Sequence, residues 1–279
     1  MRTEPCVQLK DYEEYLRQEE RSANTIGKYV RDLRAFFSYQ GEMPLTKELV
    51  LGWKEKLMSS YAPASVNSML AAVNSFLSFT GRPECRVRLV RIQREVFLEP
   101  EKELTQKEYA RLVEAAGREG KERLSTVIQT ICATGIRVSE LQYITVEAVK
   151  CGRAEVNCKG KRRTVFLPDR LRTLLSRYAK KQKRTAGPVF VTRTGKPLDR
   201  SNIWRDMKTL CEDAKVAPGK VFPHNLRHLF ARTYYTLEKD ISRLADILGH
   251  TNINTTRIYT AESGAVHIRQ IGRMGLVIT

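Results

Sequence analysis

The sequence predicts a mainly α-helical protein of two domains, the second of which carries a small antiparallel β-sheet. Three observations lead to this fold class. The chain has 279 residues, and a domain holds roughly 150 residues, so the length suits two domains. Apolar residues recur at three- and four-residue spacing in both halves, as they do on helices that bury one face. Only one pair of short segments, around Val156 and Val165, has the pattern of a hairpin.

The first hundred residues predict four helices joined by short turns. One helix carries Leu9, Tyr12 and Leu16 on one face and ends near residues 21–22. A second begins at residues 24–25, a third follows residues 44–46, and a fourth begins at residues 62–65. Each places apolar residues at helical spacing, and four short helices of this kind make a compact bundle.

A linker separates this bundle from the second domain. The helical pattern weakens after residue 81, and we place the domains at residues 1–97 and 105–279, with the linker at residues 98–104. Thr105 followed three residues later by Glu108 is the capping-box signature of a helix start. Further helices are predicted over residues 124–134 and from Val138, before the hairpin, and more helices follow it.

The composition is that of an ordinary folded protein. Hydrophobic residues make up 42% of the chain, which argues against a disordered or collagen-like protein. No stretch reaches the roughly 18 to 20 apolar residues of a membrane span, and the N-terminus has no apolar signal segment, so we expect a cytoplasmic protein without a membrane partner. The cysteines are scattered without zinc-site spacing and are interpreted as reduced thiols. They are Cys6, Cys85, Cys132, Cys151, Cys158 and Cys211.

The charge balance favours a polyanionic partner. Lys and Arg number 49 against 31 Asp and Glu, which gives a formal net charge of +18. Nucleic acid is the first candidate, because Lys and Arg neutralise phosphates and release the counterions bound to them. The alternative is a basic protein that binds no polyanion.

Four short segments of the second half contain residues capable of catalysis. They are TGIRVSEL at residues 134–141, CKGKRR at residues 158–163, PHNLRH at residues 223–228, and LGH at residues 248–250, with a tyrosine nine residues later. Each has an ordinary alternative. Arg137 could be a surface ion-pair partner of Glu140, and Lys159 could be a solvated turn residue. His224 could be a capping histidine, and Tyr259 could belong to the core.

Together the four segments resemble the tyrosine recombinases, the phage-integrase family of site-specific DNA recombinases. The family's motifs T-G-x-R-x-x-E-L, K-G, H-x-L-R-H and L-G-H followed by T-T-x-x-Y match at Arg137, Glu140, Lys159, His224, Arg227, His228, His250 and Tyr259. The run after K-G is about one residue shorter than is usual in the family, so Lys161 is an alternative to Lys159. The first half resembles the family's core-binding domain at Ser22, Thr25, Tyr29, Asp32, Leu33, Ser65, Val66 and Asn67.

The resemblance implies a four-helix, SAM-like core-binding domain and a mainly helical catalytic domain with a small antiparallel sheet. Tyr259 would be the nucleophile, and its 3′-phosphotyrosyl ester would conserve the energy of the broken bond. Arg137 and Arg227 would hold the scissile phosphate, because a guanidinium stays charged and can bond two oxygens at once. The sequence shows no carboxylate cluster typical of a two-metal nuclease, and neither a metal nor a cofactor is expected.

The remaining catalytic roles also come from the resemblance. Lys159 would protonate the departing 5′ oxygen, His224 would assist the proton transfer from Tyr259, and His250 would donate a hydrogen bond to a phosphate oxygen. The residues that would orient these groups are Glu140 and His228.

The implied partner is double-stranded DNA with inverted-repeat core sites, bound by a homotetramer, with accessory DNA-bending proteins as a further class of partner. The tail, residues 264–279, would be exchanged between subunits. Candidates for contacts to the DNA backbone are Arg86, Arg88, Arg91, Arg94, Lys161, Arg162 and Arg163. The expected process is DNA integration, excision or inversion. The alternatives are a recombinase that resolves chromosome dimers, a type IB topoisomerase and a DNA-binding protein without catalysis.

Overall fold

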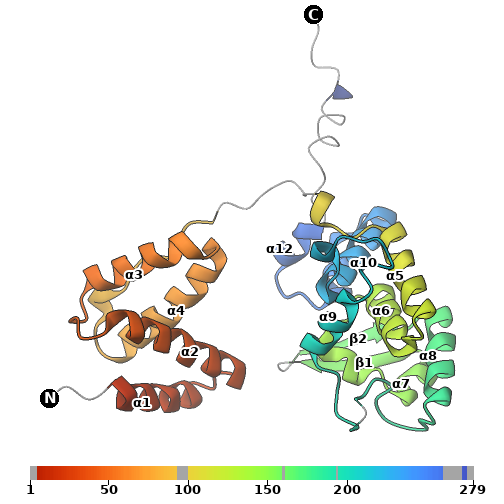
Figure 1. Ribbon diagram of the computed structural model, residues 1–279, viewed down its shortest axis with the longest axis horizontal. Helices are drawn as coiled ribbons and strands as arrows, with labels where there is room; N and C mark the ends of the chain where they lie inside the picture. Colours follow the sequence, from red (N-terminus) through yellow and green to blue (C-terminus); the bar gives the residue numbers. More distant parts are fainter. Residues whose placement is uncertain (1–4, 93–99, 159–160, 193, 260–271, 275–279) are drawn as a thin grey trace, which may run out of the picture. The chain divides into compact units, whose positions relative to one another are not determined.

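The computed structural model describes residues 5–92, 100–158, 161–192, 194–259 and 272–274. It divides into two compact units, Met1–Arg94 and Glu95–Thr279, which Figure 1 shows in different colours along the chain. Both units are mainly helical, and the one described sheet has two antiparallel strands. The fold class predicted from the sequence is therefore confirmed.

The first unit is a bundle of four helices. They are α1 (Pro5–Gln18), α2 (Ala23–Gln40), α3 (Lys47–Ser60) and α4 (Pro63–Phe79). The side chains of Ser22 and Thr46 accept hydrogen bonds from backbone N–H groups in the first turns of α2 and α3, which fixes both starts. Tyr12, Phe36 and Phe76 are fully buried in the core of this unit.

An extended segment returns along α4 after the short 3₁₀ helix η1 (Pro83–Cys85). The side-chain amide of Asn74 donates to the carbonyl of Val87 over 2.8 Å and accepts from its N–H over 3.0 Å. Asn67 makes the same pair of bonds with Val90, at 2.8 and 2.7 Å. Each asparagine side chain satisfies one backbone donor and one backbone acceptor of the extended segment. The two asparagines of α4 thus make the hydrogen bonds that a neighbouring β-strand would otherwise make with this segment.

The second unit carries eight of the described α-helices and the sheet. Its α-helices and strands are α5 (Gln106–Arg118), α6 (Glu122–Thr134), α7 (Val146–Cys151), β1 (Arg153–Cys158), β2 (Lys161–Phe166), α8 (Asp169–Lys181), α9 (Arg200–Lys208), α10 (Pro223–Glu238), α11 (Ile241–Leu248) and α12 (Ile253–Thr256). Its 3₁₀ helices are η2 (Pro100–Lys102), η3 (Val138–Tyr143), η4 (Pro218–Lys220) and η5 (Arg257–Tyr259). Both α5 and α10 pack against α6.

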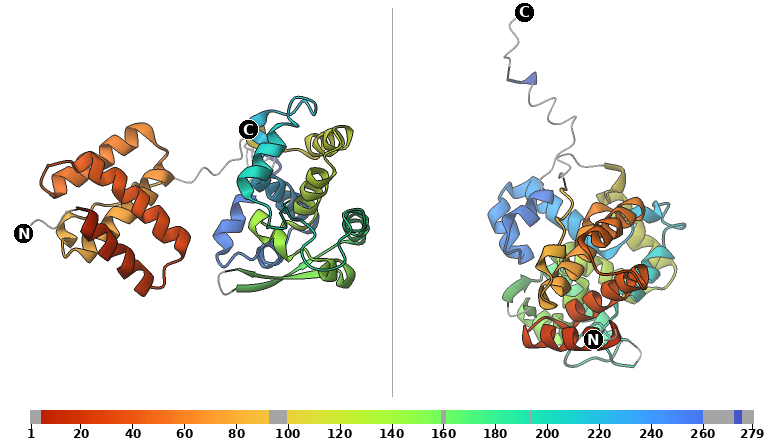
Figure 2. Two further views of the ribbon diagram at one scale, coloured as in Figure 1. Left: turned by 60° about the horizontal axis from the view of Figure 1, so that its bottom comes forward. Right: turned by 90° about the vertical axis from the view of Figure 1, so that its left-hand side faces the viewer.

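Local signals placed several of these elements correctly. The capping box at the start of α5 is confirmed: the N–H of Glu108 donates to the Thr105 hydroxyl over 3.2 Å, and the Thr105 N–H donates to the Glu108 carboxylate over 2.8 Å. In the hairpin, Arg153 lies opposite Phe166 and Ala154 opposite Val165. Figure 2 shows this hairpin at the edge of the second unit.

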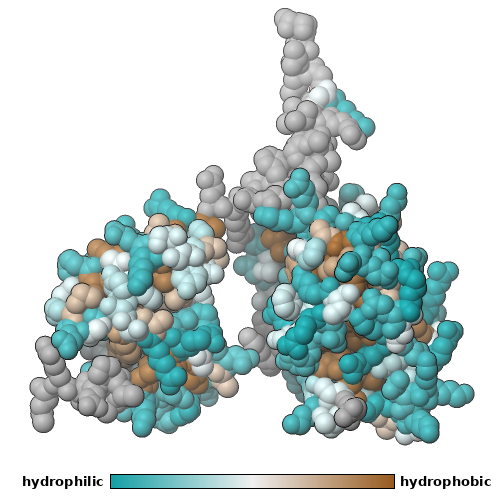
Figure 3. All heavy atoms as spheres, in the orientation of Figure 1, coloured by the Kyte–Doolittle hydropathy of each residue, from teal (hydrophilic) through white to brown (hydrophobic). Residues whose placement is uncertain are grey.

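The apolar side chains of the second unit form a core that the hairpin and the surrounding helices share. Leu112, Ile128, Leu175 and Leu226 are fully buried in it. Hydrophilic residues cover much of the visible face of both units in Figure 3. Within the described ranges, no helix combines the length and the apolar character needed to cross a bilayer.

Candidate active site

A left-handed glycine places Arg137 at the site. Helix α6 ends at Thr134, and Gly135 continues at φ +63°, a conformation that costs other residues steric strain. A Cβ on Gly135 would also lie 2.5 Å from Cδ1 of Phe230 on α10. The turn buries Ile136 and leaves the Arg137 side chain 37% exposed, so the guanidinium can reach a ligand.

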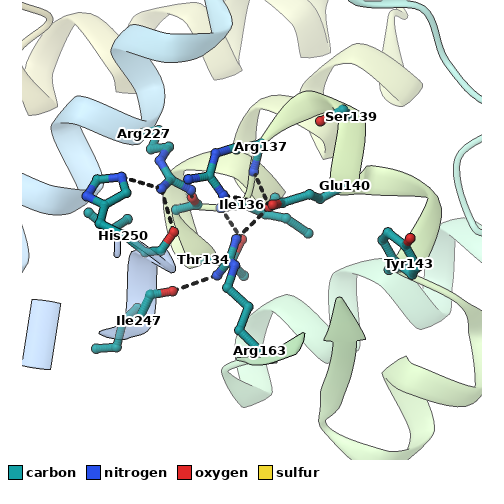
Figure 4. A network of polar contacts seen from close by, with 12 residues as sticks. Thr134, Ile136, Arg137, Ser139, Glu140, Tyr143, Arg163, Arg227, Ile247 and His250 are labelled. Carbon is teal, nitrogen blue, oxygen red and sulfur yellow. Dashed lines mark hydrogen bonds and ion pairs between the residues drawn. The ribbon is translucent and has the colours of Figure 1, made fainter. Parts of the chain in front are cut away.

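Glu140 holds two arginines from different elements. Its carboxylate is 2.8 Å from the Arg137 guanidinium and 2.5 Å from that of Arg163 on β2, as Figure 4 shows. It also accepts the Arg137 backbone N–H over 3.0 Å. Burial alone would raise the pKa of this carboxyl, but the Arg137 N–H and the two guanidinium charges outweigh burial and lower the pKa. Glu140 is therefore a buried carboxylate that orients Arg137.

Arg163, predicted as a contact to the DNA backbone, lies between Glu140 and the end of α11. Its side chain is only 11% exposed. One terminal nitrogen pairs with Glu140, and the other donates to the carbonyl of Ile247 over 2.6 Å. The side chain also passes so close to Gly249 that a Cβ there would lie 2.5 Å from its Cδ. Arg163 thus connects the hairpin to the end of α11, just before His250.

Arg227 is buried at the centre of the site. It is 1% exposed, and its terminal nitrogens donate to the carbonyls of Gly135 over 2.5 Å and of Leu248 over 2.7 Å. Its Nε is buried without a protein partner. Burial first, and the Arg137 charge second, lower the pKa of Arg227 to about 10. The guanidinium therefore remains charged at neutral pH, and its Nε–H donor is left without a partner among the described residues.

The contacts of His250 define its tautomer. Its Nε2 lies 3.0 Å from the second terminal nitrogen of Arg227, and its Nδ1 lies 2.9 Å from the Thr256 hydroxyl. A guanidinium has no acceptor, so Nε2 must accept and Nδ1 must carry the proton that is donated to Thr256. Burial, followed by the charges of Arg227 and Arg137, lowers the pKa of His250 to about 4. His250 is therefore neutral at pH 7.

Tyr259 packs against two imidazole rings near the start of α10. It lies on η5 and is 3% exposed. Its ring stacks on His250 at a centroid distance of 6.0 Å and meets His228 edge-on at 4.9 Å. The His228 ring in turn lies 4.6 Å from that of His224. Burial and the neighbouring charges of His228 and Arg227 lower the pKa of His224 to about 4.

The structure thus brings together most of the residues predicted to be catalytic. Arg137, Arg227 and His250 lie close together beside Thr134 in Figure 4, and Tyr259 contacts His250 and His228. Small-ligand sites typically have volumes of about 300 to 1,000 Å³, and a cavity of about 920 Å³ opens beside Arg137, Arg162 and His250. It can admit a phosphodiester.

The other predicted residues lie elsewhere or outside the described residues. Arg86, Arg88 and Arg91 are exposed on the first unit, where the first two line a hollow of about 700 Å³ together with Arg21 and Lys47. Arg162 is exposed on β2. Lys159 and Arg94 fall outside the described residues, as do the side chain of Lys161 and most of the predicted tail.

Sequence reasoning missed two members of the site. Thr256 stands in the T-T-x-x-Y motif, but only its hydrogen bond to His250 shows what it does. The role of Arg163 is set by Glu140, 23 residues away, and no local pattern signals such a contact. Among the residues that the structure describes, no group of three or more His, Cys, Asp and Glu could hold a metal ion.

Comparison with known proteins shows the family of the chain. The model of the phage integrase family matches residues 102–265, and that of the phage integrase N-terminal SAM-like domain matches residues 9–82. Tyrosine recombinase XerA of Pyrococcus furiosus is 28% identical over 271 residues, covering 94% of this chain and 91% of its own length. Tyrosine recombinase XerC of Roseiflexus castenholzii is 31% identical, covering 86% and 83%.

Solved structures share the fold. A lambda integrase dimer bound to a COC′ core site has a TM-score of 0.73 at 17% identity, over 91% of this chain and 94% of that one. The Tn1549 transposon integrase in complex with transposon right end DNA also has a TM-score of 0.73, at 16% identity, over 99% and 100%.

Proposed function

The chain belongs to the phage integrase family of tyrosine recombinases, and from this premise we propose that Tyr259 attacks a DNA phosphodiester held by Arg137 and Arg227. The activity is site-specific cleavage and rejoining of DNA. The observation that carries the assignment of residues is the cluster itself, in which both arginines are anchored around Gly135 and Tyr259 packs on His250.

The proposed reaction conserves the number of phosphoester bonds. The phenolic oxygen of Tyr259 attacks phosphorus in line, a 3′-phosphotyrosyl bond forms, and the bond from phosphorus to the 5′ oxygen breaks. The phenol loses a proton and the departing 5′ oxygen gains one, from Lys159 in our proposal. A 5′ hydroxyl from another duplex then attacks the phosphotyrosine, which releases Tyr259 and exchanges the strands.

The two arginines stabilise the charge that develops on the non-bridging oxygens. Arg137 is held in place by Glu140, and Arg227 by two carbonyls, so neither has to be reorganised when the charge appears. This rigidity matters because a misplacement of about 1 Å costs roughly 100-fold in rate.

The two histidines with lowered pKa have different roles in the proposed reaction. His224 is neutral at pH 7, so it has a free lone pair with which to accept the proton of Tyr259. His250 accepts from Arg227 in the absence of DNA. A phosphate bound at Arg227 adds negative charge beside the imidazole and favours its protonated form, in which Nε2 donates to a phosphate oxygen.

The proposed partner is duplex DNA with inverted-repeat core sites, bound by four copies of the chain. A net charge of +18 and the exposed Arg86, Arg88 and Arg91 support contacts to phosphates. A solved lambda integrase tetramer is bound to a Holliday junction, and its fold matches this chain with a TM-score of 0.72. A DNA substrate also favours the cytoplasm as the place of action. The relatives named XerA and XerC are compatible with resolution of chromosome dimers as well as with integration.

A groove on the second unit supports exchange of the tail between subunits. The groove has a volume of about 500 Å³ and lies between α5, α6 and α10. Its apolar lining includes Tyr109, Phe230 and Leu237, and Leu237 is 75% exposed. We propose that the apolar tail of a neighbouring copy, within residues 264–279, occupies it. Because Phe230 also faces Gly135, the groove adjoins the turn that carries Arg137. Leu237→Glu should then weaken tetramer assembly on DNA, measured by sedimentation.

A nicked suicide duplex tests the assignment of Tyr259. After cleavage the short 5′ strand diffuses away, and the covalent protein–DNA adduct accumulates and can be counted on a denaturing gel. Tyr259→Phe should abolish the adduct. Tyr235→Phe, which removes a tyrosine hydroxyl from α10 itself, should retain it. Adduct formed by Tyr259→Phe would refute the assignment. Strand exchange between two labelled sites distinguishes a recombinase from a topoisomerase.

A further inference from the structure

One face of α10 holds the segment through which the chain enters the second unit. Asn225, His228 and Arg232 are three and four residues apart, so they share that face. Asn225 donates to the carbonyl of Lys102 over 3.1 Å, and Arg232 donates to the carbonyl of Leu104 over 2.7 Å. The residue between these two carbonyls is Glu103, which contacts α10 through its side chain.

The Glu103 carboxylate lies between two side chains of α10. Its two oxygens are 3.6 Å from Nδ1 of His228 and 3.2 Å from the Arg232 guanidinium. The side chain of Glu103 is only 13% exposed. Burial alone would raise the pKa of Glu103, but the neighbouring His228 and the Arg232 charge lower it. A carboxylate therefore faces Nδ1 of His228 at neutral pH.

His228 contacts Tyr259 and His224, which are the nucleophile and its proton acceptor in the proposed reaction. Its ring meets Tyr259 edge-on at 4.9 Å and lies 4.6 Å from the His224 ring. Its Nε2 is buried and has no hydrogen-bond partner in the protein. In the part of the chain that the structure describes, the polar group that pairs with this ring is the Glu103 carboxylate, so this contact favours one orientation of the ring.

We propose that Glu103 is a positioning residue for the nucleophile: it fixes the His228 ring, and this ring sets the place of Tyr259 relative to His224. The inference rests on the proposed function of Tyr259. Without the carboxylate, the imidazole can rotate about its χ2 angle, which is broad for histidine. Tyr259 then no longer packs against a ring of fixed orientation, and the fraction of molecules aligned for in-line attack falls.

The test compares two glutamates of the same segment. Glu103→Gln keeps the shape of the side chain and removes its charge. We expect the rate of adduct formation on the nicked duplex, at saturating protein, to fall by about tenfold or more, with the Kd for DNA within twofold of the unsubstituted protein. Glu101→Gln, at an exposed position two residues earlier, should leave both quantities unchanged. A cleavage rate of Glu103→Gln within twofold of the unsubstituted rate would overturn the inference.

A double-mutant cycle separates positioning from a general effect on folding. If Glu103 acts through His228, then Glu103→Gln should change the cleavage rate by less than twofold in a His228→Gln background, because the ring to be held is already gone. The same tenfold loss in both backgrounds would overturn the inference. Thermal unfolding of all four proteins shows whether each remains folded at the assay temperature.

A sulfur leaving group identifies the side of the reaction that is affected. A thiolate leaves without protonation, so a duplex with sulfur in place of the bridging 5′ oxygen removes the need for a general acid. The defect of Glu103→Gln should persist on this duplex, and its disappearance would overturn the inference. The Tyr259→Phe result distinguishes the two failures: adduct formed by that variant refutes the proposed function, whereas unimpaired Glu103→Gln beside inactive Tyr259→Phe refutes only the role of Glu103.

Discussion

Arg227 donates a hydrogen bond to Nε2 of His250 over 3.0 Å. The contact is possible only while the imidazole is neutral at Nε2, because a protonated ring would offer a second donor to the guanidinium. Protonation of His250 in the DNA-free protein therefore places two cations in contact. The stability of the site should consequently depend on pH.

Acidification should destabilise the second unit through His250. Its pKa is about 4 in the folded protein against an ordinary value of 6.5. Between these two values the unfolded chain binds the proton and the folded protein does not, so stability falls as the pH falls from 6.5 towards 4. His224 contributes with the same sign. The melting temperature should drop between pH 7 and pH 5, and His250→Asn should reduce that drop. Equal slopes for the two proteins would contradict the prediction.

The neighbouring Arg162 and Arg163 should behave differently when replaced by alanine. Arg163 is 11% exposed and paired with the buried Glu140, so Arg163→Ala should lower the free energy of unfolding by about 3 kcal/mol, measured with urea. Arg162 is exposed, so Arg162→Ala should change it by less than about 0.5 kcal/mol. If Arg162 contacts a phosphate, its loss reduces the salt slope of DNA binding by about 1. A stable Arg163→Ala protein with a reduced salt slope would reverse the two assignments.

Alanine substitutions at two glycines distinguish the cost of backbone strain from the cost of a steric clash. Gly135 and Gly120 have φ angles of +63° and +67°, but only at Gly135 would a Cβ meet other atoms. Gly120→Ala should cost about 1 to 2 kcal/mol of unfolding free energy and leave the rate of DNA cleavage unchanged. Gly135→Ala should cost more, because Phe230 must move, and it should slow cleavage, because the Gly135 carbonyl anchors Arg227. Equal effects of the two substitutions would show that Phe230 relaxes freely.

The asparagines of α4 should matter for DNA binding. Removing either side-chain amide breaks two hydrogen bonds, so Asn67→Ala and Asn74→Ala should each cost about 1 to 2 kcal/mol in the stability of the first unit. The double variant should bind DNA roughly tenfold more weakly by fluorescence anisotropy, a loss of about 1.4 kcal/mol. Adduct formation at saturating DNA should be unaffected. Asn24→Ala, at an exposed position of α2, provides the control. Unchanged affinity of the double variant would contradict the role of the amide pairs.

Local sequence signals predicted the elements, and distant contacts determined the site. The second helix was predicted to begin at residues 24–25, and α2 begins at Ala23. The capping box of α5 depends on residues three positions apart, so periodicity and a local cap were sufficient to place both helix starts closely. The helix predicted from Val138 is a 3₁₀ helix, a distinction that the apolar pattern does not make. Arg163 resembled a surface cation because its partner, Glu140, belongs to a different element. Contacts of this kind depend on tertiary packing, which no local pattern encodes.

The pairing of α4 with the segment beside it depends on matching repeat lengths. Asn67 and Asn74 are seven residues apart, a rise of about 10.5 Å along a helix. From Val87 to Val90 an extended chain advances about 10 Å at roughly 3.3 Å per residue. Helix and segment therefore remain in phase over both amide pairs. An insertion or deletion of one residue between the two valines would destroy this register and detach the extended segment from α4. Replacing an arginine of the segment by lysine would leave the path of its backbone unchanged.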